Sequence, residues 1–156
     1  MSKTIVLAVD AARHVSAAAD MTRELSRDSG DRVIVLHVHE FAVGRFGRLQ
    51  VDCVEGAGER LVAEIVDDLK QAGVTADAEI REANYGHVVR KILDAADEHD
   101  ARMLVLGSHG RVDLPVALGS VSHRLLHHAR RPVLIVPRNP NTPVAEAAAS
   151  ATATVD

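Results

Sequence analysis

Residues 101–137 read ARMLVLGSHGRVDLPVALGSVSHRLLHHARRPVLIVP, and this stretch decides the fold. The apolar run at 103–106 is typical of a strand that is buried on both faces. A loop that carries glycines follows it, and apolar residues at helical spacing begin after Ser120. Pro132 ends this helical pattern, and the apolar run at 133–136 predicts another buried strand. The order strand, loop, helix, strand is typical of an α/β protein with a parallel sheet.

The loop between the first strand and the helix of this stretch has features that suit a phosphate group. Gly107, Gly110 and Gly119 have no side chains, so the backbone can approach an anion closely. The first N–H groups of a helix lack intrahelical acceptors, and the helix dipole adds partial positive charge there. Ser120 can donate its hydroxyl to a phosphate oxygen. The simpler interpretation is that the glycines only turn the chain and that Ser120 only caps the helix.

The common phosphate-binding motifs are absent from the sequence. There is no G-x-x-x-x-G-K-[ST] and no G-x-G-x-x-G. Residues 107–110 form only the short pattern G-x-x-G, which is weak by itself.

At these residues the chain resembles the universal stress protein family. Its nucleotide-binding members carry Gly-x2-Gly-x9-Gly-Ser/Thr after the fourth strand. Gly107, Gly110, Gly119 and Ser120 match this motif, although eight residues instead of nine separate Gly110 from Gly119. The resemblance extends over about residues 3–138.

The resemblance implies an adenine nucleotide site at the carboxyl ends of the first and fourth strands, with ATP as the ligand, with or without Mg²⁺. In the family, an aspartate that matches Asp10 contacts the nucleotide and an apolar residue that matches Val38 touches adenine. From the residues alone, Asp10 is equally suited to an Asx turn or a helix cap. The predicted nucleotide site consists of Ala8, Asp10, Val38, Leu106, Gly107, His109, Gly110, Arg111, Gly119, Ser120, Val121 and Ser122.

Hydrophobic periodicity along the whole chain predicts alternating strands and helices. The expected fold is therefore an open five-stranded parallel sheet with helices on both faces, and the resemblance implies the strand order 3-2-1-4-5. The connection at 40–57 is expected to be an irregular loop. The predicted strands are 4–9, 32–38, 76–81, 103–106 and 133–136, and the predicted helices are 14–29, 59–72, 87–99 and one that begins at Ser120.

Length and composition fit one domain, expected at 1–138, followed by a tail at 139–156 that is rich in Ala, Thr and Pro and is expected to be disordered. A formal net charge of −4 argues against binding to nucleic acid. No apolar run is long enough to span a membrane, and no signal peptide pattern is visible. The single cysteine excludes an internal disulfide, so we expect a cytoplasmic protein.

The sequence offers no recognisable catalytic machinery. There is no Walker lysine and no carboxylate pair at metal-binding spacing, so binding is expected instead of catalysis. His37 and His39 share one face of a strand, but a metal site needs further ligands, and we expect none. The main hypothesis is an ATP-binding stress-response or signalling module. The alternatives are a dimeric adaptor that binds no nucleotide and, more weakly, a slow ATP hydrolase. Family members commonly dimerise through the last strand, so we expect a homodimer through Pro132–Val136.

Overall fold

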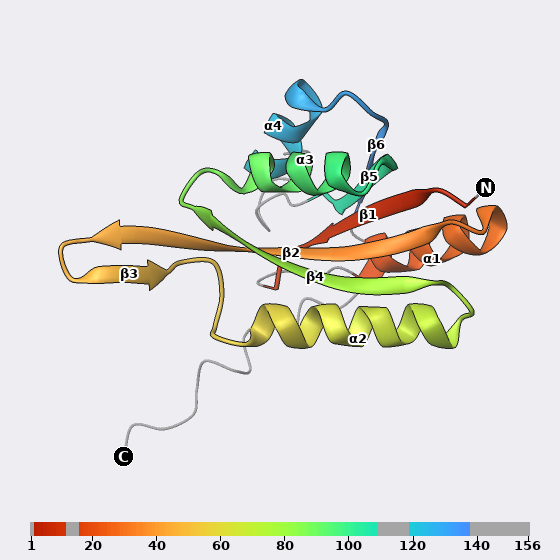
Figure 1. Ribbon diagram of the computed structural model, residues 1–156, viewed down its shortest axis with the longest axis horizontal. Helices are drawn as coiled ribbons and strands as arrows, with labels where there is room; N and C mark the ends of the chain where they lie inside the picture. Colours follow the sequence, from red (N-terminus) through yellow and green to blue (C-terminus); the bar gives the residue numbers. More distant parts are fainter. Residues whose placement is uncertain (1, 12–15, 109–118, 138–156) are drawn as a thin grey trace, which may run out of the picture.

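A computed structural model of the chain describes residues 2–11, 16–108 and 119–137. In this part of the chain, strands and helices alternate, apart from one inserted hairpin strand (Figure 1). The elements are β1 (Thr4–Val9), α1 (Ser16–Ser29), β2 (Arg32–Gly44), β3 (Gly47–Gln50), α2 (Ala57–Gln71), β4 (Ala76–Asn84), α3 (Val88–Glu98), β5 (Ala101–Gly107), α4 (Ser120–His128) and β6 (Val133–Val136).

The sheet confirms the expected fold class and contains one strand more than expected. Parallel pairing joins β4 to β2, β2 to β1, β1 to β5, and β5 to β6. These five strands therefore have the order expected from the resemblance. The sixth strand, β3, pairs antiparallel with β2.

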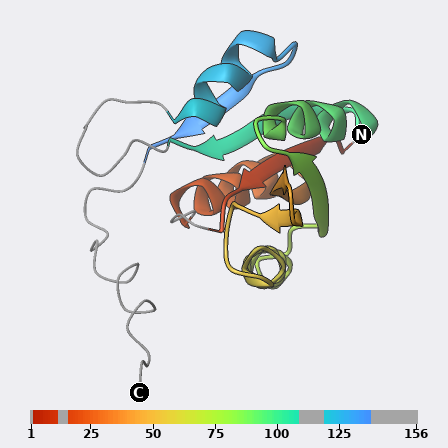
Figure 2. The same ribbon diagram turned by 90° about the vertical axis from the view of Figure 1, so that its left-hand side faces the viewer.

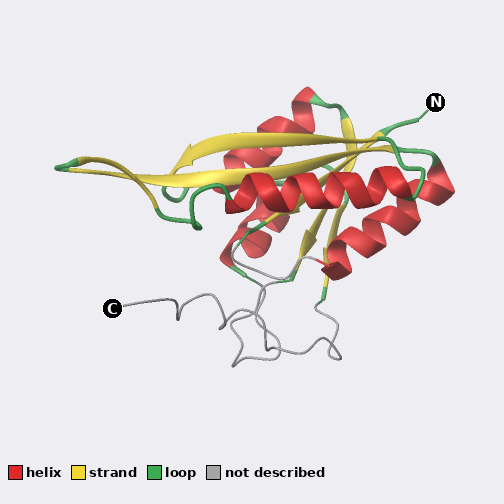
Figure 3. Ribbon diagram, turned by 90° about the horizontal axis from the view of Figure 1, so that it is seen from below, coloured by secondary structure: helices red, strands yellow, loops and turns green. Residues whose placement is uncertain are grey.

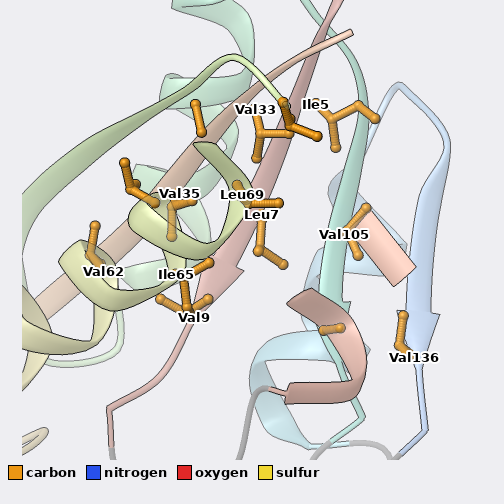
Figure 4. Close-up of a cluster of buried hydrophobic side chains, with 14 residues drawn as sticks. Ile5, Leu7, Val9, Val33, Val35, Val62, Ile65, Leu69, Val105 and Val136 are labelled. Carbon is orange, nitrogen blue, oxygen red and sulfur yellow. The ribbon is translucent and has the colours of Figure 1, made fainter. Parts of the chain in front are cut away.

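Two hydrophobic cores lie on opposite faces of the sheet, because successive side chains of a strand point to opposite faces. Helices α1 and α2 cover one face, and α3 and α4 cover the other (Figures 2 and 3). On the first face, Ile5, Leu7 and Val33 pack with side chains of α2 such as Leu69 (Figure 4). Aliphatic side chains fill both cores, as the near absence of aromatic residues requires.

The prediction of an irregular loop at 40–57 is wrong as far as residue 50 and is confirmed only for the connection at 51–56. Strand β2 continues to Gly44, turns, and returns as β3, so that the two strands extend as an arm beyond the sheet (Figure 1). Strand β4 is also longer than predicted and stays paired with β2 as far as Asn84. Polar side chains are tolerated along this extension because it projects into solvent on more than one side. Hydrophobicity alone therefore placed the ends of both strands too early.

The structure bears differently on the expected tail and on the expected absence of a membrane span. The tail at 139–156 lies outside the described residues. Among the helices that the structure describes, none combines the length and the apolar character needed to cross a membrane.

Candidate nucleotide site

A cleft of about 290 Å³ opens where the carboxyl ends of β1 and β5 and the middle of β2 face the start of α4. This volume is at the lower end of the ~300–1,000 Å³ range of ligand pockets. In open α/β sheets, ligands bind at the carboxyl edge where the strand order reverses. Strand β1 is at that position here, with β2 on one side and β5 on the other. The cleft therefore lies where the topology favours a ligand.

The register of β1 and β5 brings the two motifs of the sequence together. Ala8 pairs with Leu106, so Asp10 and Gly107 leave the sheet at the same edge. Both line the cleft. Asp10, after the end of β1, and Gly107, at the end of β5, therefore contribute to the same cleft.

The start of helix α4 forms another wall of the cleft. Its N-cap is Gly119, which has no side chain with which to cap the helix. The N–H of His123 donates to the carbonyl of Gly119 (2.9 Å) as the helix begins. The amides of Ser120, Val121 and Ser122 precede that bond, and first-turn amides have no intrahelical acceptor. The Ser122 hydroxyl donates to the carbonyl of Gly107 (3.3 Å), which ties the helix start to the end of β5.

Every predicted site residue that the structure describes lines this one cleft. His109, Gly110 and Arg111 lie outside the described residues. The residues brought together are Ala8, Asp10, Val38, Leu106, Gly107, Gly119, Ser120, Val121 and Ser122.

Several cleft residues were missed by the sequence reasoning. Val88 and Ile92 come from α3 and, with Leu36 of β2, provide an apolar wall. Their positions on the predicted apolar stripe of α3 gave no sign that they reach a ligand site. Glu40 and Asp52 add carboxylates to the cleft. Only the hairpin of β2 and β3 brings Asp52 back to the sheet, and the glycines that flank its turn, Gly44 and Gly47, were the available signal.

His37 and Asp52, which line the cleft, also belong to a polar cluster with His39 and Cys53, in which the two histidines are buried and the other two residues are partly buried. Burial and the neighbouring Asp52 carboxylate raise the pKa of the Cys53 thiol to about 11. Burial disfavours the charged form of His39, but Glu59 and Asp52 outweigh it and raise the pKa of its imidazole. Burial also opposes ionisation of Asp52, yet hydrogen bonds from Cys53, its own backbone and His39 hold the pKa of its carboxyl below the usual value.

A second hollow lies on the outer side of α3 and α4 and is strongly basic. Arg90, Arg124, Arg130 and Arg131 line it. Asp94 and Asp97 also line it, and three of these arginines have partners: Arg90 pairs with Asp94, Arg131 pairs with Asp97, and Arg124 donates to the carbonyl of Gly86. None of the described residues of the glycine motif lines this hollow, which is a competing place for an anion.

Comparison with known proteins identifies the family. The universal stress protein family matches residues 1–137, and the chain belongs to this family. This confirms the resemblance seen in the sequence. No curated protein matches the chain significantly.

Solved structures of universal stress proteins share the fold. One from Burkholderia pseudomallei is 25% identical, with a TM-score of 0.65, over 87% of this chain and 96% of that chain. One in complex with cAMP is 26% identical, with a TM-score of 0.60, over 87% of this chain and 97% of that chain. One from Arabidopsis thaliana with AMP bound is 21% identical, with a TM-score of 0.63, over 92% of this chain and 97% of that chain.

Proposed function

We propose that this protein binds an adenine nucleotide, with ATP as the physiological ligand, in the cleft at the carboxyl ends of β1 and β5. The observation that carries the proposal is the meeting of Asp10, Gly107 and Ser120 around one cleft. The cAMP complex of a protein of the same family, 26% identical to this chain, supports an adenine ligand. In this role the protein is a stress-response or signalling module of the cytoplasm.

The two ends of the cleft differ in the way that a nucleotide requires. Val38, Val88 and Ile92 supply an apolar surface on which the adenine ring packs. The amides of Ser120 to Ser122 supply hydrogen-bond donors for phosphate oxygens. Each backbone hydrogen bond to a charged oxygen is worth roughly 1.5–3 kcal/mol. Three such bonds are enough for micromolar binding, about −8 kcal/mol, when packing of the base offsets the cost of association.

Carboxylates in the cleft favour ATP bound to Mg²⁺ over free ATP. Asp10, Glu40 and Asp52 all line it, and they repel a free triphosphate. A Mg²⁺ ion bound together with the phosphates would offset this repulsion. We therefore propose that ATP binds with Mg²⁺ and that Asp10 is the carboxylate nearest to it.

Calorimetric titration of ATP into the full chain tests the binding. We expect one site in the micromolar range with Mg²⁺, weaker binding without it, and no comparable binding of GTP.

The substitution Gly119→Val is expected to reduce the affinity for ATP at least tenfold, because a branched side chain then occupies the phosphate position. Gly119 has φ −59° and ψ 156°, a conformation that valine adopts readily. Gly44→Val, on the β2 arm and away from the cleft, is the matched control. Absence of ATP binding at millimolar concentration contradicts the proposal.

We also propose a homodimer through β6. Within the described residues this strand pairs only with β5, so its other edge offers backbone groups to a second strand. Light scattering at micromolar concentration is expected to give twice the chain mass, and a monomer mass contradicts this. A stable dimer that binds no nucleotide favours the alternative function, a dimeric adaptor.

We also propose that the protein binds ATP without hydrolysing it. Among the described residues that line the cleft there is no lysine or arginine to stabilise a phosphoryl group in transfer. We expect no ATP turnover above that of a Gly119→Val control. Slow turnover that disappears in an Asp10→Ala variant is the result that favours the weaker alternative, a slow hydrolase.

A further inference from the structure

Four side chains with metal-binding atoms meet between β2 and the chain that returns from β3. They are His37, His39, Asp52 and Cys53, and their ligand atoms all lie within 4.8 Å of one another. The two histidines are nearly inaccessible to solvent, with exposed fractions of 1% and 5%. They lie two residues apart on β2, on the face covered by α2.

The spacing of the four donor atoms fits a tetrahedral zinc ion. Zinc bonds of about 2.0–2.3 Å place tetrahedral ligand atoms roughly 3.3–3.6 Å apart. Asp52 Oδ2 lies 3.1 Å from His37 Nε2, 3.2 Å from His39 Nδ1 and 3.2 Å from Cys53 Sγ. Cys53 Sγ lies 3.8 Å from His37 Nε2. Shifts of a few tenths of an ångström bring these four distances to the tetrahedral values, and the remaining ligand atoms, which lie within 4.8 Å of one another, must move closer as the ion binds.

In each imidazole, the ring nitrogen that faces away from the cluster is held by a hydrogen-bond acceptor, as is usual in metal-bound histidines. The Nδ1 of His37 lies 2.9 Å from the carbonyl oxygen of Val9, an acceptor that requires a proton on this nitrogen. The Nε2 of His39 lies 2.8 Å from Oε1 of Glu59 and donates to this carboxylate. In the neutral tautomers that these contacts select, His37 Nε2 and His39 Nδ1 carry lone pairs that point into the cluster.

The inside of the cluster is short of positive partners. In the tautomer that donates to Val9, His37 presents an acceptor nitrogen to Asp52 Oδ2, so this carboxylate oxygen depends on the Cys53 thiol and the protonated form of His39 for its hydrogen bonds. Asp52 Oδ1 is also buried and has no hydrogen-bond partner in the part of the chain that the structure describes. The Gln50 amide lies 3.1 Å from His39 Nδ1, but it also donates to the carbonyl of Cys53 and can serve that acceptor alone. A divalent cation supplies the missing positive charge.

We propose that His37 Nε2, His39 Nδ1, Asp52 and Cys53 Sγ bind a Zn²⁺ ion. On binding, the Cys53 S–H bond breaks, its proton passes to solvent, and a Zn–S bond forms, so that thiolate and carboxylate balance the two charges of the ion. Imidazole and thiolate donors suit zinc and disfavour Mg²⁺ and Ca²⁺. Four protein ligands make a closed, structural site.

Such a site fixes one wall of the nucleotide cleft. Asp52 and His37 line that cleft. The ion links β2 to the chain after β3, and through Glu59 to the first turn of α2. This inference does not depend on nucleotide binding, because none of the four ligand side chains is among the groups proposed to contact adenine or phosphate.

Titration of zinc chloride into the full chain, first stripped of metal with a chelator, tests the proposal. We expect one Zn²⁺ per chain, competition with a chromophoric chelator, and a rise in melting temperature that EDTA reverses. Cobalt(II) in the same site is expected to give intense visible bands of a tetrahedral ion and a near-ultraviolet band of thiolate bonding. Weak octahedral cobalt bands, or no binding of Zn²⁺, overturn the proposal.

Two variants assign the ligands. Cys53→Ser is expected to lose the thiolate band and to bind zinc at least tenfold more weakly. His39→Gln is expected to weaken zinc binding to the same extent, and it provides the test if Cys53→Ser does not fold. The control replaces His123 and His127, an exposed pair on α4 with ring centroids 4.7 Å apart, by glutamine. It is expected to leave the zinc affinity unchanged. Zinc binding that is lost in this control and kept in the Cys53 variant overturns the proposal.

Discussion

Replacement of Gly58 by alanine probes the contact between α2 and β2. A Cβ atom at Gly58 would lie 2.2 Å from Cδ2 and 2.6 Å from Nε2 of His37, far inside the contact distance. The His37 ring is buried, and its hydrogen bond to the carbonyl of Val9 fixes its orientation. The ring therefore cannot turn away without losing this bond.

Two effects of opposite sign decide the size of the change. Overpacking of a well-packed core costs about 1–3 kcal/mol. Alanine in a helix is favoured over glycine by about 1 kcal/mol. We therefore expect Gly58→Ala to lower the free energy of unfolding by about 1 kcal/mol, with about 2 kcal/mol as the upper end.

Urea unfolding of matched variants measures this change. Ala63→Gly, at an exposed position of the same helix, isolates helix propensity and is expected to cost about 1 kcal/mol. If propensity alone mattered, Gly58→Ala would stabilise the protein by a similar amount. A gain in stability on Gly58→Ala therefore refutes the packing argument.

Two further predictions concern stability. Leu125 is fully buried, whereas its neighbour Leu126 is 45% exposed. In denaturant unfolding, Leu125→Ala is therefore expected to lower the free energy of unfolding by about 2–5 kcal/mol and Leu126→Ala by less than about 1 kcal/mol. Similar losses in the two variants would contradict the assigned buried face of α4. Burial opposes ionisation of Asp31, but bonds from the Lys3 amide and Ser29, with Arg102, hold the pKa of its carboxyl below the usual 3.8. Its contribution, about 1.5–3 kcal/mol for charged hydrogen bonds, is then complete above about pH 4 and is lost as pH falls through the lowered pKa. The stability difference between the protein and Asp31→Asn is expected to shrink from pH 6 to pH 3, and a constant difference would contradict it.

The sequence predicted the central part of the fold because buried parallel strands leave a strong hydrophobic signal. Strand β6 was placed at Val133–Val136, where it is found, and β1 at Thr4–Val9. The gathering of Asp10 with Gly107 and Ser120 was predictable because the carboxyl ends of adjacent parallel strands meet at one edge. Each of these elements is defined by its own local pattern.

The β2–β3 arm and the polar cluster were not predictable in the same way. The arm is partly solvated on more than one side, so its residues carry no clear hydrophobic period, and Glu40–Gln50 resembled a loop. His37 and His39 were recognised as neighbours on one face. Their partners Asp52 and Cys53 reach them only through the antiparallel return of β3, a long-range contact that no spacing in the sequence encodes.

Backbone amide shifts in NMR spectra, recorded as ATP and Mg²⁺ are added to the full chain, test the central claim most directly. The account predicts that the largest shifts fall on Gly107 and on Gly119 to Ser122, with smaller ones at Val38 and Asp10. Shifts confined to the basic hollow around Arg90 and Arg124, or no shifts at millimolar ATP, would contradict it.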